Sequence, residues 1–485
     1  MALLDTCALA ALCHQESQAA AATPPKRAVV IGGSLAGLLA ARVLHDHFDE
    51  VWLLDRHPLP GDDEPRRATP HTRHTHALLA RGRQAIEALF PGIGDAWLAA
   101  GGRLGDVGSE AAFYAGRRRF AQAPADAQGL CLGRGAIEGT LRRRVLALPR
   151  LRVVTGIDVQ GLAGRPSAER AGGRIDGLRW RAAGDEARGP AATLRAALVV
   201  DASGRASRLP KWLAELGHAT PDEQAVQVDI RYATAYLRRA PHHAPGLEAV
   251  ITAATADHPA PSVLLSQEGE RWVVTLGGYG ADAPPLDRAG FIARAQRTAP
   301  PELAAVVQDA EFLCEPFGYR FPHSQRRFYE RLRHLPEGVL AIGDSICSFN
   351  PVFGQGMSVA ACEAEALQAA LALGQSGLAR RYFRAAARVI DIAWQTAVGA
   401  DLAIPSVQGE RPLPLRMINA YVARVFDAAQ TDAVVAVAFQ RVSHLLAEPP
   451  SLMRPAIMAR VLRAAWRAGR QRGGALGGAQ TRAAA

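Results

Sequence analysis

Five short runs of the chain are apolar at almost every position. They cover residues 27–31, 50–55, 151–155, 197–201 and 339–343. A continuous apolar run of this length is typical of a strand that is buried on both faces, as in a parallel sheet. Helical patterns lie between the runs, for example at 35–47 and 138–148. This alternation of strands and helices predicts an α/β fold with a Rossmann-like sheet.

Residues 225–280 have a different pattern. Positions 226–236 alternate between apolar and polar residues, and 271–276 do so less regularly. Such alternation suits an antiparallel sheet that is covered on one face. The pattern from 360 to 472 is mostly helical, and the Gly- and Arg-rich stretch 163–189 predicts a hairpin or a surface loop.

The patterns divide the chain into regions. We predict a discontinuous Rossmann-like domain over 26–100, 130–210 and 335–375. An inserted antiparallel-sheet domain that binds the substrate would cover 101–129 and 211–334, and a helical C-terminal region would cover 376–472. Residues 1–25 and 473–485 are expected to be a disordered extension and tail. Asp5 interrupts the apolar N-terminus and no cation precedes it, so a secretory signal is not indicated.

Composition narrows the class of protein. With 49% hydrophobic and 21% charged residues among 485, the chain has a globular composition, which excludes a wholly disordered protein. The chain contains no run of about 18 apolar residues, so no transmembrane helix is predicted. The net charge is +10, but only Lys26 and Lys211 are lysines, so the arginine excess reflects a GC-rich gene rather than a nucleic-acid partner. The six cysteines form no CxxC pair, which indicates a cytoplasmic location.

A glycine-rich loop follows the first apolar run. Gly32, Ser34 and Gly37 occupy the three positions of a GxGxxG loop, and Gly33 beside the serine keeps the loop flexible. Such a loop lets a pyrophosphate approach the backbone and the N-terminus of the next helix. An acid about 20 residues further on commonly binds the ribose, and Asp55 lies 23 residues after Gly32. NAD and FAD are both compatible with this motif. Its candidate residues are Gly32, Gly33, Ser34, Ala36, Gly37, Asp55 and Arg56.

A second motif discriminates between the two cofactors. Gly343-Asp344, Pro351 and Gly354-Gln-Gly-Met357 follow the last apolar run and precede a helix of small residues. The segment resembles the GD…P…GQGM fingerprint of FAD-dependent monooxygenases of the para-hydroxybenzoate hydroxylase-like superfamily. The resemblance implies that Asp344 binds the ribityl chain of FAD. It also implies that the loop and the helix N-terminus approach the pyrimidine edge of the flavin. The candidate residues are Gly343, Asp344, Pro351, Gly354, Gln355, Gly356 and Met357.

The middle motif of that superfamily is altered in this chain. Instead of DGxxSxxR, the strand at 197–200 leads into Asp201-Ala-Ser-Gly-Arg-Ala-Ser-Arg208. This form is similar to the branch that contains geranylgeranyl reductases, halogenases and polyether epoxidases. Asp201 and Ala202 are then expected beside the cofactor, as is Arg134 near the FAD phosphates. The altered motif leaves open whether NAD(P)H reduces the flavin directly or through a separate flavin reductase.

Three further segments narrow the resemblance. Residues 55–60, 71–79 and 411–416 look like the monensin-type flavin epoxidases of polyether biosynthesis, and this resemblance covers most of 27–465. It does not extend to the lysine-type halogenases. Residues 271–275 are not WxWxIP, and no lysine lies between Lys26 and Lys211.

Two other segments contain residues that could bind a metal, a substrate or a partner. His71, His74 and His76 have no cysteine or carboxylate partners at ligand spacing, so no metal site is predicted. We expect this segment to border the flavin and name His74, His76, Phe349 and Phe353 as candidate substrate-pocket residues. The amphipathic, basic segment 456–472 is either a terminal helix packed on the body or a contact with a membrane or carrier protein.

The resemblance implies an FAD-dependent monooxygenase of secondary metabolism. A C4a-hydroperoxyflavin formed with molecular oxygen would insert one oxygen atom into a large apolar natural-product intermediate, free or carrier-bound, by epoxidation or hydroxylation. No catalytic side chain is predicted, because the flavin carries the chemistry. The alternatives are aromatic hydroxylation, Baeyer–Villiger oxidation and a flavin-dependent C=C reductase or dehydrogenase.

Overall fold

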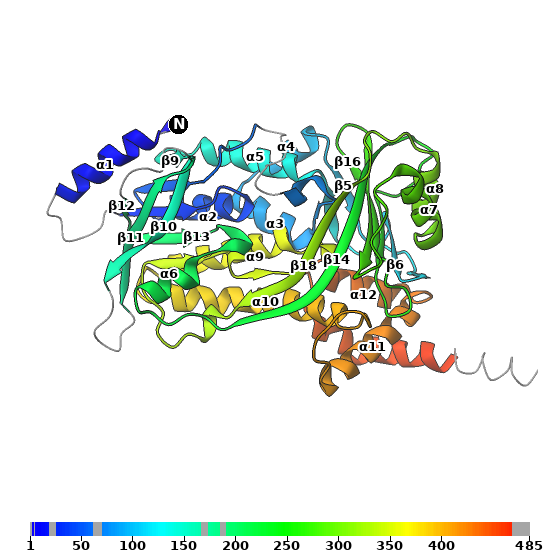
Figure 1. Cartoon of the computed structure of the whole chain (residues 1–485). Coiled ribbons are helices and arrows are strands. Elements are labelled where there is room, and N and C mark those ends of the chain that lie inside the picture. Colours follow the sequence, from blue (N-terminus) through cyan, green and yellow to red (C-terminus); the bar gives the residue numbers. More distant parts are fainter. Residues whose placement is uncertain are drawn as a thin grey trace, which may run out of the picture. The chain divides into compact units, whose positions relative to one another are not determined.

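The computed structural model describes residues 2–3, 5–18, 26–61, 70–165, 173–184 and 191–467 (Figure 1). The chain forms two compact units. Unit 1 contains Met1–Gly102, Leu132–Val226 and His323–Gln395, and unit 2 contains Arg103–Cys131, Gln227–Pro322 and Thr396–Ala485. No helix in these described ranges is long and apolar enough to cross a bilayer.

Unit 1 is built on a six-stranded parallel sheet. The strand order is β1-β9-β3-β2-β13-β19, and all neighbours run parallel. The strands are β1 (Ala2–Leu3), β9 (Leu151–Val154), β3 (Glu50–Leu54), β2 (Arg27–Ile31), β13 (Leu198–Asp201) and β19 (Val339–Ala341). Every residue of β2, β13 and β19 is buried, which explains why the apolar runs do not alternate. The predicted α/β fold is confirmed.

Helices accompany this sheet. Those that matter for the site are α2 (Leu35–His45), α3 (Ala80–Leu89), α5 (Arg134–Leu146), α9 (Gly356–Ala372) and α10 (Leu378–Asp401). The helix α9 packs against both α2 and α3. The shorter helices are α4 (Ile93–Ala99) and α6 (Leu209–Glu215). A separate antiparallel sheet joins β10 (Ile157–Arg165), β11 (Arg174–Ala182) and β12 (Ala192–Arg195). The stretch 163–189, predicted as a hairpin or a surface loop, belongs to the hairpin of the first two strands; its residues 166–172 and 185–189 lie outside the described ones.

Most of unit 2's larger sheet is antiparallel, as predicted, but β15 and β6 pair in parallel. The strand order of this sheet is β20-β18-β14-β17-β16-β15-β6-β7, where β20 is Cys347–Ser348. The strands β14 (Glu223–Arg238) and β18 (Phe317–Arg327) have residues in both units. The remaining strands are β17 (Arg271–Tyr279), β16 (Ser262–Gln267), β15 (Ala249–Ala253), β6 (Ala111–Ala115) and β7 (Arg118–Arg119). The helices α7 (Arg288–Thr298) and α8 (Pro301–Asp309) pack on one face through an apolar cluster that includes Trp272 and Phe291 (Figure 1).

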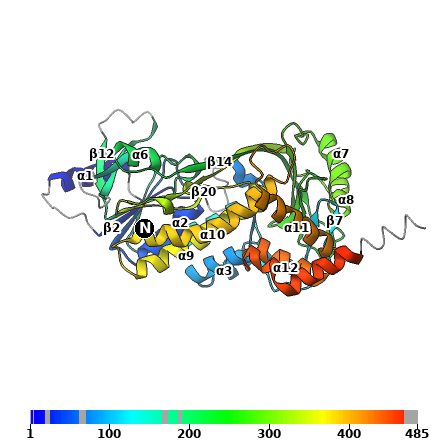
Figure 2. The same cartoon turned by 90° about the horizontal axis from the view of Figure 1, so that it is seen from below.

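The C-terminal part of unit 2 is helical. It comprises α11 (Leu413–Ala429), α12 (Ala433–Ser443), a 3₁₀ turn at Pro449–Met453 and a last helix over 455–467, which we call the terminal helix. Val425, Val435 and Val461 from these three helices are fully buried in one cluster together with Phe120 (Figure 2). The region predicted as helical over 376–472 is therefore divided, because most of α10 belongs to unit 1. Residues 473–485 lie outside the described part of the chain.

The N-terminus differs from the prediction of a disordered extension at 1–25. The strand β1 extends the parallel sheet beside β9, and α1 (Thr6–Gln18) packs against β12. Leu9 is completely buried and Cys13 nearly so. The prediction was wrong because the segment has no clear helical periodicity. Its two buried side chains are stabilised by a sheet that only the folded protein provides.

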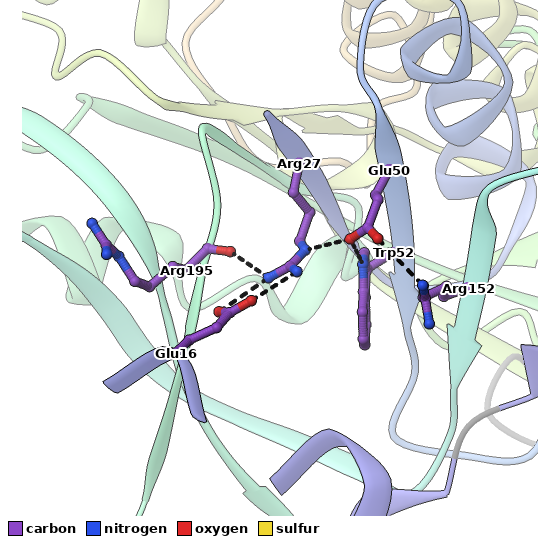
Figure 3. A network of polar contacts seen from close by, with 6 residues as sticks. All are labelled: Glu16, Arg27, Glu50, Trp52, Arg152 and Arg195. Atoms are coloured by element: carbon purple, nitrogen blue, oxygen red, sulfur yellow. Dashed lines mark hydrogen bonds and ion pairs between the residues drawn. The ribbon is translucent and has the colours of Figure 1, made fainter. Parts of the chain in front are cut away.

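A buried arginine links this helix to the sheet (Figure 3). Arg27 at the start of β2 has a side chain that is 5% exposed and forms ion pairs with Glu16 at 2.8 Å and with Glu50 at 3.1 Å. It also donates to the carbonyl of Arg195 and lies 4.9 Å from the centre of the Trp52 ring. A buried guanidinium needs such partners, because its desolvation is costly when a charge is left unpaired.

We therefore expect removal of residues 1–24 to lower the free energy of unfolding by about 3 kcal/mol, because it exposes the pocket of Leu9 and leaves Arg27 without Glu16. The single change Glu16→Gln should cost about 1–2 kcal/mol. Urea unfolding measures both. Lys26→Gln is the control, since its pair with Asp49 is exposed and contributes little. Equal stability of the truncated and full chains would contradict the structural role of α1.

Candidate functional site

Three sequence motifs meet at the carboxyl edge of the parallel sheet. In the register of the sheet, Asp201 at the end of β13 lies opposite Ile31 of β2 and Ala341 of β19. Ile31 in turn lies opposite Leu54 of β3. Since the four strands end at one level, the loops that follow them begin side by side. The crevice at the carboxyl ends of such strands is where α/β folds bind ligands.

The first loop is held by close backbone contacts. Gly32 has φ +104°, and a Cβ there would lie 2.5 Å from the carbonyl oxygen of Ala202. A Cβ at Gly37 would lie 1.8 Å from the carbonyl oxygen of Gly32. Both positions therefore require glycine for reasons of space, as the motif predicts. At Gly33 a Cβ would come within 2.8 Å of Leu59, so Gly33 rather than Ser34 makes the tight approach.

Asp55 organises the same loop. Its Oδ2 accepts a hydrogen bond of 2.7 Å from the amide of Gly33, and its Oδ1 accepts one of 2.9 Å from the amide of His57. The side chain is buried, whereas the neighbouring Arg56 is exposed. These two bonds hold the loop backbone around the carboxylate, at the position where such a motif binds a ribose.

A hydrogen-bonded triad covers the N-terminus of α2. Ser34 precedes this helix and does not cap it; its Oγ donates to Glu138 Oε1 at 2.9 Å. Arg134 donates from Nε to the same oxygen at 2.8 Å and from Nη2 to Ser34 Oγ at 3.3 Å. Glu138 on α5 was not predicted from the sequence. Its side chain is 3% exposed and fixes the guanidinium of Arg134 beside the helix N-terminus, where an anion is favoured.

Two histidines adjoin this triad in their neutral form. Burial lowers the pKa of His76 to about 3, and the charge of Arg134 acts in the same direction. Burial and Arg73 lower the pKa of His74 to about 4. The carbonyl oxygen of His74 can only accept, so Nδ1 of His76 carries the ring proton and donates to it at 2.8 Å. The Nε2 atom of His76 is therefore an acceptor near neutral pH.

The middle loop is tied to the loop after β19. Asp201 is fully buried and accepts from the Ser203 amide at 2.9 Å and from Ser207 Oγ at 2.5 Å. The Gly204 amide donates to Ser345 Oγ at 2.9 Å, and Arg205 donates to Ser348 Oγ at 3.1 Å. Asp201 thus shapes its own loop, while the Ala202 carbonyl packs on Gly32.

Asp344 lies between these loops and the triad. The residue is exposed to solvent, yet burial raises its pKa against the opposing charges of Arg134 and Arg205. The preceding Gly343 has φ +66°, and a Cβ there would lie 2.8 Å from that of Ala36 on α2. The GD motif is therefore pressed against the helix of the first motif.

Open space lies before the N-terminus of α9. Gln355 is the N-cap residue, but no side chain caps the helix. A Cβ at Gly356 would find no protein atom within 4 Å, and Gly354 is equally open with φ +64°. In the described residues the buried Gln355 Oε1 has no hydrogen-bond partner. An apolar ring with polar edges needs open space beside hydrogen-bonding groups. The uncapped amides of α9, the open positions Gly354 and Gly356, and the Oε1 atom of Gln355 provide both. The residues therefore fit a flavin.

The remaining members of the second motif frame this space. Pro351 is exposed and begins the turn Pro351–Phe353, which Asn350 caps by accepting from the amide of Val352. Met357 is buried in the first turn of α9. Of the two phenylalanines predicted as pocket walls, Phe349 is 7% exposed and packs in the core, whereas Phe353 is half-buried.

Glu363 on α9 accepts a hydrogen bond from the backbone of the GD motif. This residue was not predicted from the sequence. The residue is completely buried, and its Oε2 accepts the amide of Gly343 at 2.5 Å. Burial raises the pKa of Glu363 to about 8, and the nearby carboxyl of Asp344 adds to the effect. A helical position seven residues after Gly356 could have suggested an inward side chain, but not its contact with Gly343.

One cluster outside this edge has the composition of a metal site. His242 and His243 place their Nε2 atoms 2.8 and 3.0 Å from Asp309 Oδ2, and no other such group occurs within the described ranges. The amide of Ala240 donates to Nδ1 of His243 at 3.1 Å, so the ring proton of this histidine resides on Nε2. A metal at Nε2 would move that proton to Nδ1 and break the bond. We interpret the cluster as a hydrogen-bonded link.

Comparison with known proteins identifies a relative that matches most of the chain. Protein Rv3254 of Mycobacterium tuberculosis is 33% identical over 445 residues, which cover 87% of this chain and 90% of that protein. A comparison with protein-family models found no match.

Solved structures share the fold at low identity. The flavin-dependent brominase Bmp2 has a TM-score of 0.61 at 16% identity, covering 92% of this chain and 99% of that chain. The probable FAD-dependent monooxygenase PqsL of Pseudomonas aeruginosa has a TM-score of 0.58 at 17% identity, covering 78% and 97%. The p-nitrophenol 4-monooxygenase PnpA of Pseudomonas putida DLL-E4 has the same score and identity, covering 87% and 99%. The chain therefore has the fold of FAD-dependent monooxygenases and related flavoproteins.

Gly356 provides a sharp test of the site. We expect Gly356→Asp to leave the stability of the flavin-free protein unchanged or slightly raised, because the position is open and an acid favours a helix N-terminus. The same change should abolish flavin binding, because the side chain fills the space of the ring and its charge opposes the flavin. Absorbance at the flavin bands and urea unfolding give the two results. Gly37→Ala is the control that disrupts the loop itself. A fully yellow Gly356→Asp protein would refute the assignment.

Glu363 generates a pH-dependent prediction. Its pKa is raised on folding, so the folded state holds a proton that the unfolded state loses above about pH 4.5, and stability falls as the pH rises from there to about 8. Glu363→Gln removes this loss while keeping an oxygen for Gly343. The variant should therefore gain stability relative to the wild type by on the order of 3 kcal/mol between pH 5 and pH 8.5. Urea unfolding at both pH values checks this. A pH-independent difference would show that Glu363 does not titrate in this range.

Proposed function

The chain belongs to the same family as protein Rv3254 of Mycobacterium tuberculosis, and on this premise and its fold we propose that it is an FAD-dependent monooxygenase. One observation supports the proposal most. The loops after β2, β13 and β19 begin at one level and press on each other, and the open N-terminus of α9 lies in the same unit. Each of these features matches a contact that a bound FAD requires.

The residues of unit 1 suit the successive parts of the cofactor. Arg134 and the uncapped N-terminus of α2 would hold the pyrophosphate, and Asp55 would accept from the ribose hydroxyls. Asp344, which is exposed to solvent after β19, would accept from the ribityl hydroxyls. Gly354 and Gly356 leave room for the pyrimidine edge in front of the α9 amides.

The protein's own part in the reaction is to bind, orient and exclude water. When bound, FAD supplies the two-electron redox chemistry that activates molecular oxygen. The dipole at the N-terminus of α9 stabilises negative charge at the facing edge of the flavin. His76 is not assigned as an acid, since its low pKa leaves no ring proton to give near neutral pH beyond the one bonded to His74. Electrons are proposed to come from NAD(P)H, directly or through a separate flavin reductase.

The proposed substrate is a large apolar intermediate that receives one oxygen atom at an alkene. The resemblance of residues 55–60, 71–79 and 411–416 to polyether epoxidases supports this choice. The half-buried Phe353, next to the open glycine surface, suits an apolar ligand. Hydroxylation of an aromatic ring would use the same arrangement.

Rapid mixing tests the reaction class. The purified protein is loaded with FAD, reduced without oxygen and mixed with oxygenated buffer while the near-ultraviolet and visible bands are followed. We expect a transient spectrum that precedes the oxidised flavin and outlasts any seen with free reduced FAD, because the site excludes water. Addition of polyenes or electron-rich aromatics should shorten its lifetime.

Direct return of the oxidised spectrum, with or without these compounds, would contradict a monooxygenase. That outcome would favour a flavin-dependent C=C reductase or dehydrogenase. Labelled oxygen gives the independent check: a monooxygenase places one atom of the gas in the product, whereas a reductase places none.

A further inference from the structure

Exposed apolar side chains gather near the C-terminal end of the described chain. Twelve large hydrophobic side chains are exposed in the described residues, and eight of them lie between Leu413 and Trp466. They are Leu413, Met417, Ile418, Val434, Met453, Met458, Leu462 and Trp466. Scattered exposed leucines need no explanation, but such a concentration in one short region indicates an interaction surface.

The terminal helix is apolar on two sides. Its inward residues Ile457, Val461 and Ala464 belong to the cluster formed with α11 and α12 (Figure 2). Met458, Leu462 and Trp466 follow one another at intervals of four residues, which places them on one stripe, and they are 39%, 55% and 60% exposed. A helix that only packs on a protein body has a polar outer face. The outer stripe is therefore an apolar surface that stays exposed to solvent.

Charge identifies the chemistry of that partner. From residue 449 to 485 the chain has seven arginines and no aspartate, glutamate or lysine, which accounts for seven of its ten net positive charges. Arg463 and Arg467 are exposed and adjoin the stripe, as does Arg454 at the start of the terminal helix. Arg460 is the exception, since it pairs with Asp432. All charged residues of the terminal helix are thus cationic, which complements an anionic surface.

We propose that the outer stripe of the terminal helix binds the surface of an anionic lipid membrane. Met458, Leu462 and Trp466 enter the boundary between headgroups and acyl chains, and Arg463 and Arg467 contact lipid phosphates. Tryptophan favours this boundary, and no described helix could cross the bilayer, so the helix lies in the plane of the surface. A nucleic acid would use the arginines but not the aliphatic side chains of the stripe.

The binding does not depend on the flavin, so it can fail while the proposed monooxygenase stands. Membrane binding would bring the protein to where apolar compounds accumulate, and only this consequence rests on the proposed function.

Intrinsic fluorescence offers a direct assay. Trp466 is 60% exposed, whereas the other six tryptophans are 5% exposed or less. The holoprotein is titrated with vesicles of phosphatidylcholine alone and of phosphatidylcholine mixed with phosphatidylglycerol, and sedimentation measures the bound fraction. We expect binding and a blue shift with the mixed vesicles only, weakened by salt. Trp466→Phe should lose most of the blue shift while still sedimenting with the vesicles.

Substitutions in the stripe and at its arginine border distinguish binding through this surface from a general attraction between the positively charged protein and the anionic lipid. Leu462→Glu and the double change Arg463→Glu with Arg467→Glu should each weaken binding at least about tenfold without lowering the melting temperature or the flavin content. Leu373→Glu is the matched control, because Leu373 is an exposed leucine of unit 1.

Three results would overturn the proposal. The first is no binding to the mixed vesicles, and the second is equal binding to both vesicle types. The third is wild-type binding by Leu462→Glu. If the holoprotein is a dimer that Leu462→Glu dissociates, and no vesicle is bound, the stripe is an interface between copies of the chain instead.

Discussion

The contact between the Gly32 backbone and the carbonyl of Ala202 is the constraint on which the site depends. It leaves no room for a side chain, and it joins the loops of two neighbouring strands. Gly343 against Ala36 joins the third loop to the helix of the first. Because both contacts are between backbone or methyl groups, they leave these loops little freedom to move relative to each other. The register of the sheet brings the ends of these strands to one level, so it also sets where the loops that follow them lie.

Buried acids hold this arrangement by accepting hydrogen bonds that the backbone and hydroxyl groups would otherwise lack. Asp55 accepts from Gly33, Asp201 from Ser203 and Ser207, and Glu363 from Gly343. Such bonds offset part of the desolvation of each carboxyl. For Glu363 the compensation is incomplete, as its raised pKa shows. These acids therefore shape the site, while Asp344 alone combines a raised pKa with exposure to solvent.

The proposed activity and the proposed membrane surface belong to different units. Unit 1 provides the helix N-termini, the open glycines and the neutral histidines that suit a flavin. Unit 2 provides a helix with an inward apolar face, an outward apolar stripe and a cationic border. A protein that acts on apolar compounds benefits from both, since such compounds partition into lipid. Each part can nevertheless be tested without the other.

The sequence by itself determined the parallel sheet and the three motifs, because buried strands and tight glycine turns impose local residue requirements that spacing reveals. Gly32, Gly37, Asp55 and Gly343 could be identified in this way. The tertiary structure alone decided the parts that depend on distant neighbours. Glu138 and Glu363 acquire their roles from Arg134 and Gly343, which no spacing predicts. The N-terminal helix is ordered because Arg27 and the sheet edge offer partners to a segment with little periodicity of its own. A sequence pattern reflects the requirements of neighbouring residues, whereas pairs of residues far apart in the sequence form only when the chain folds.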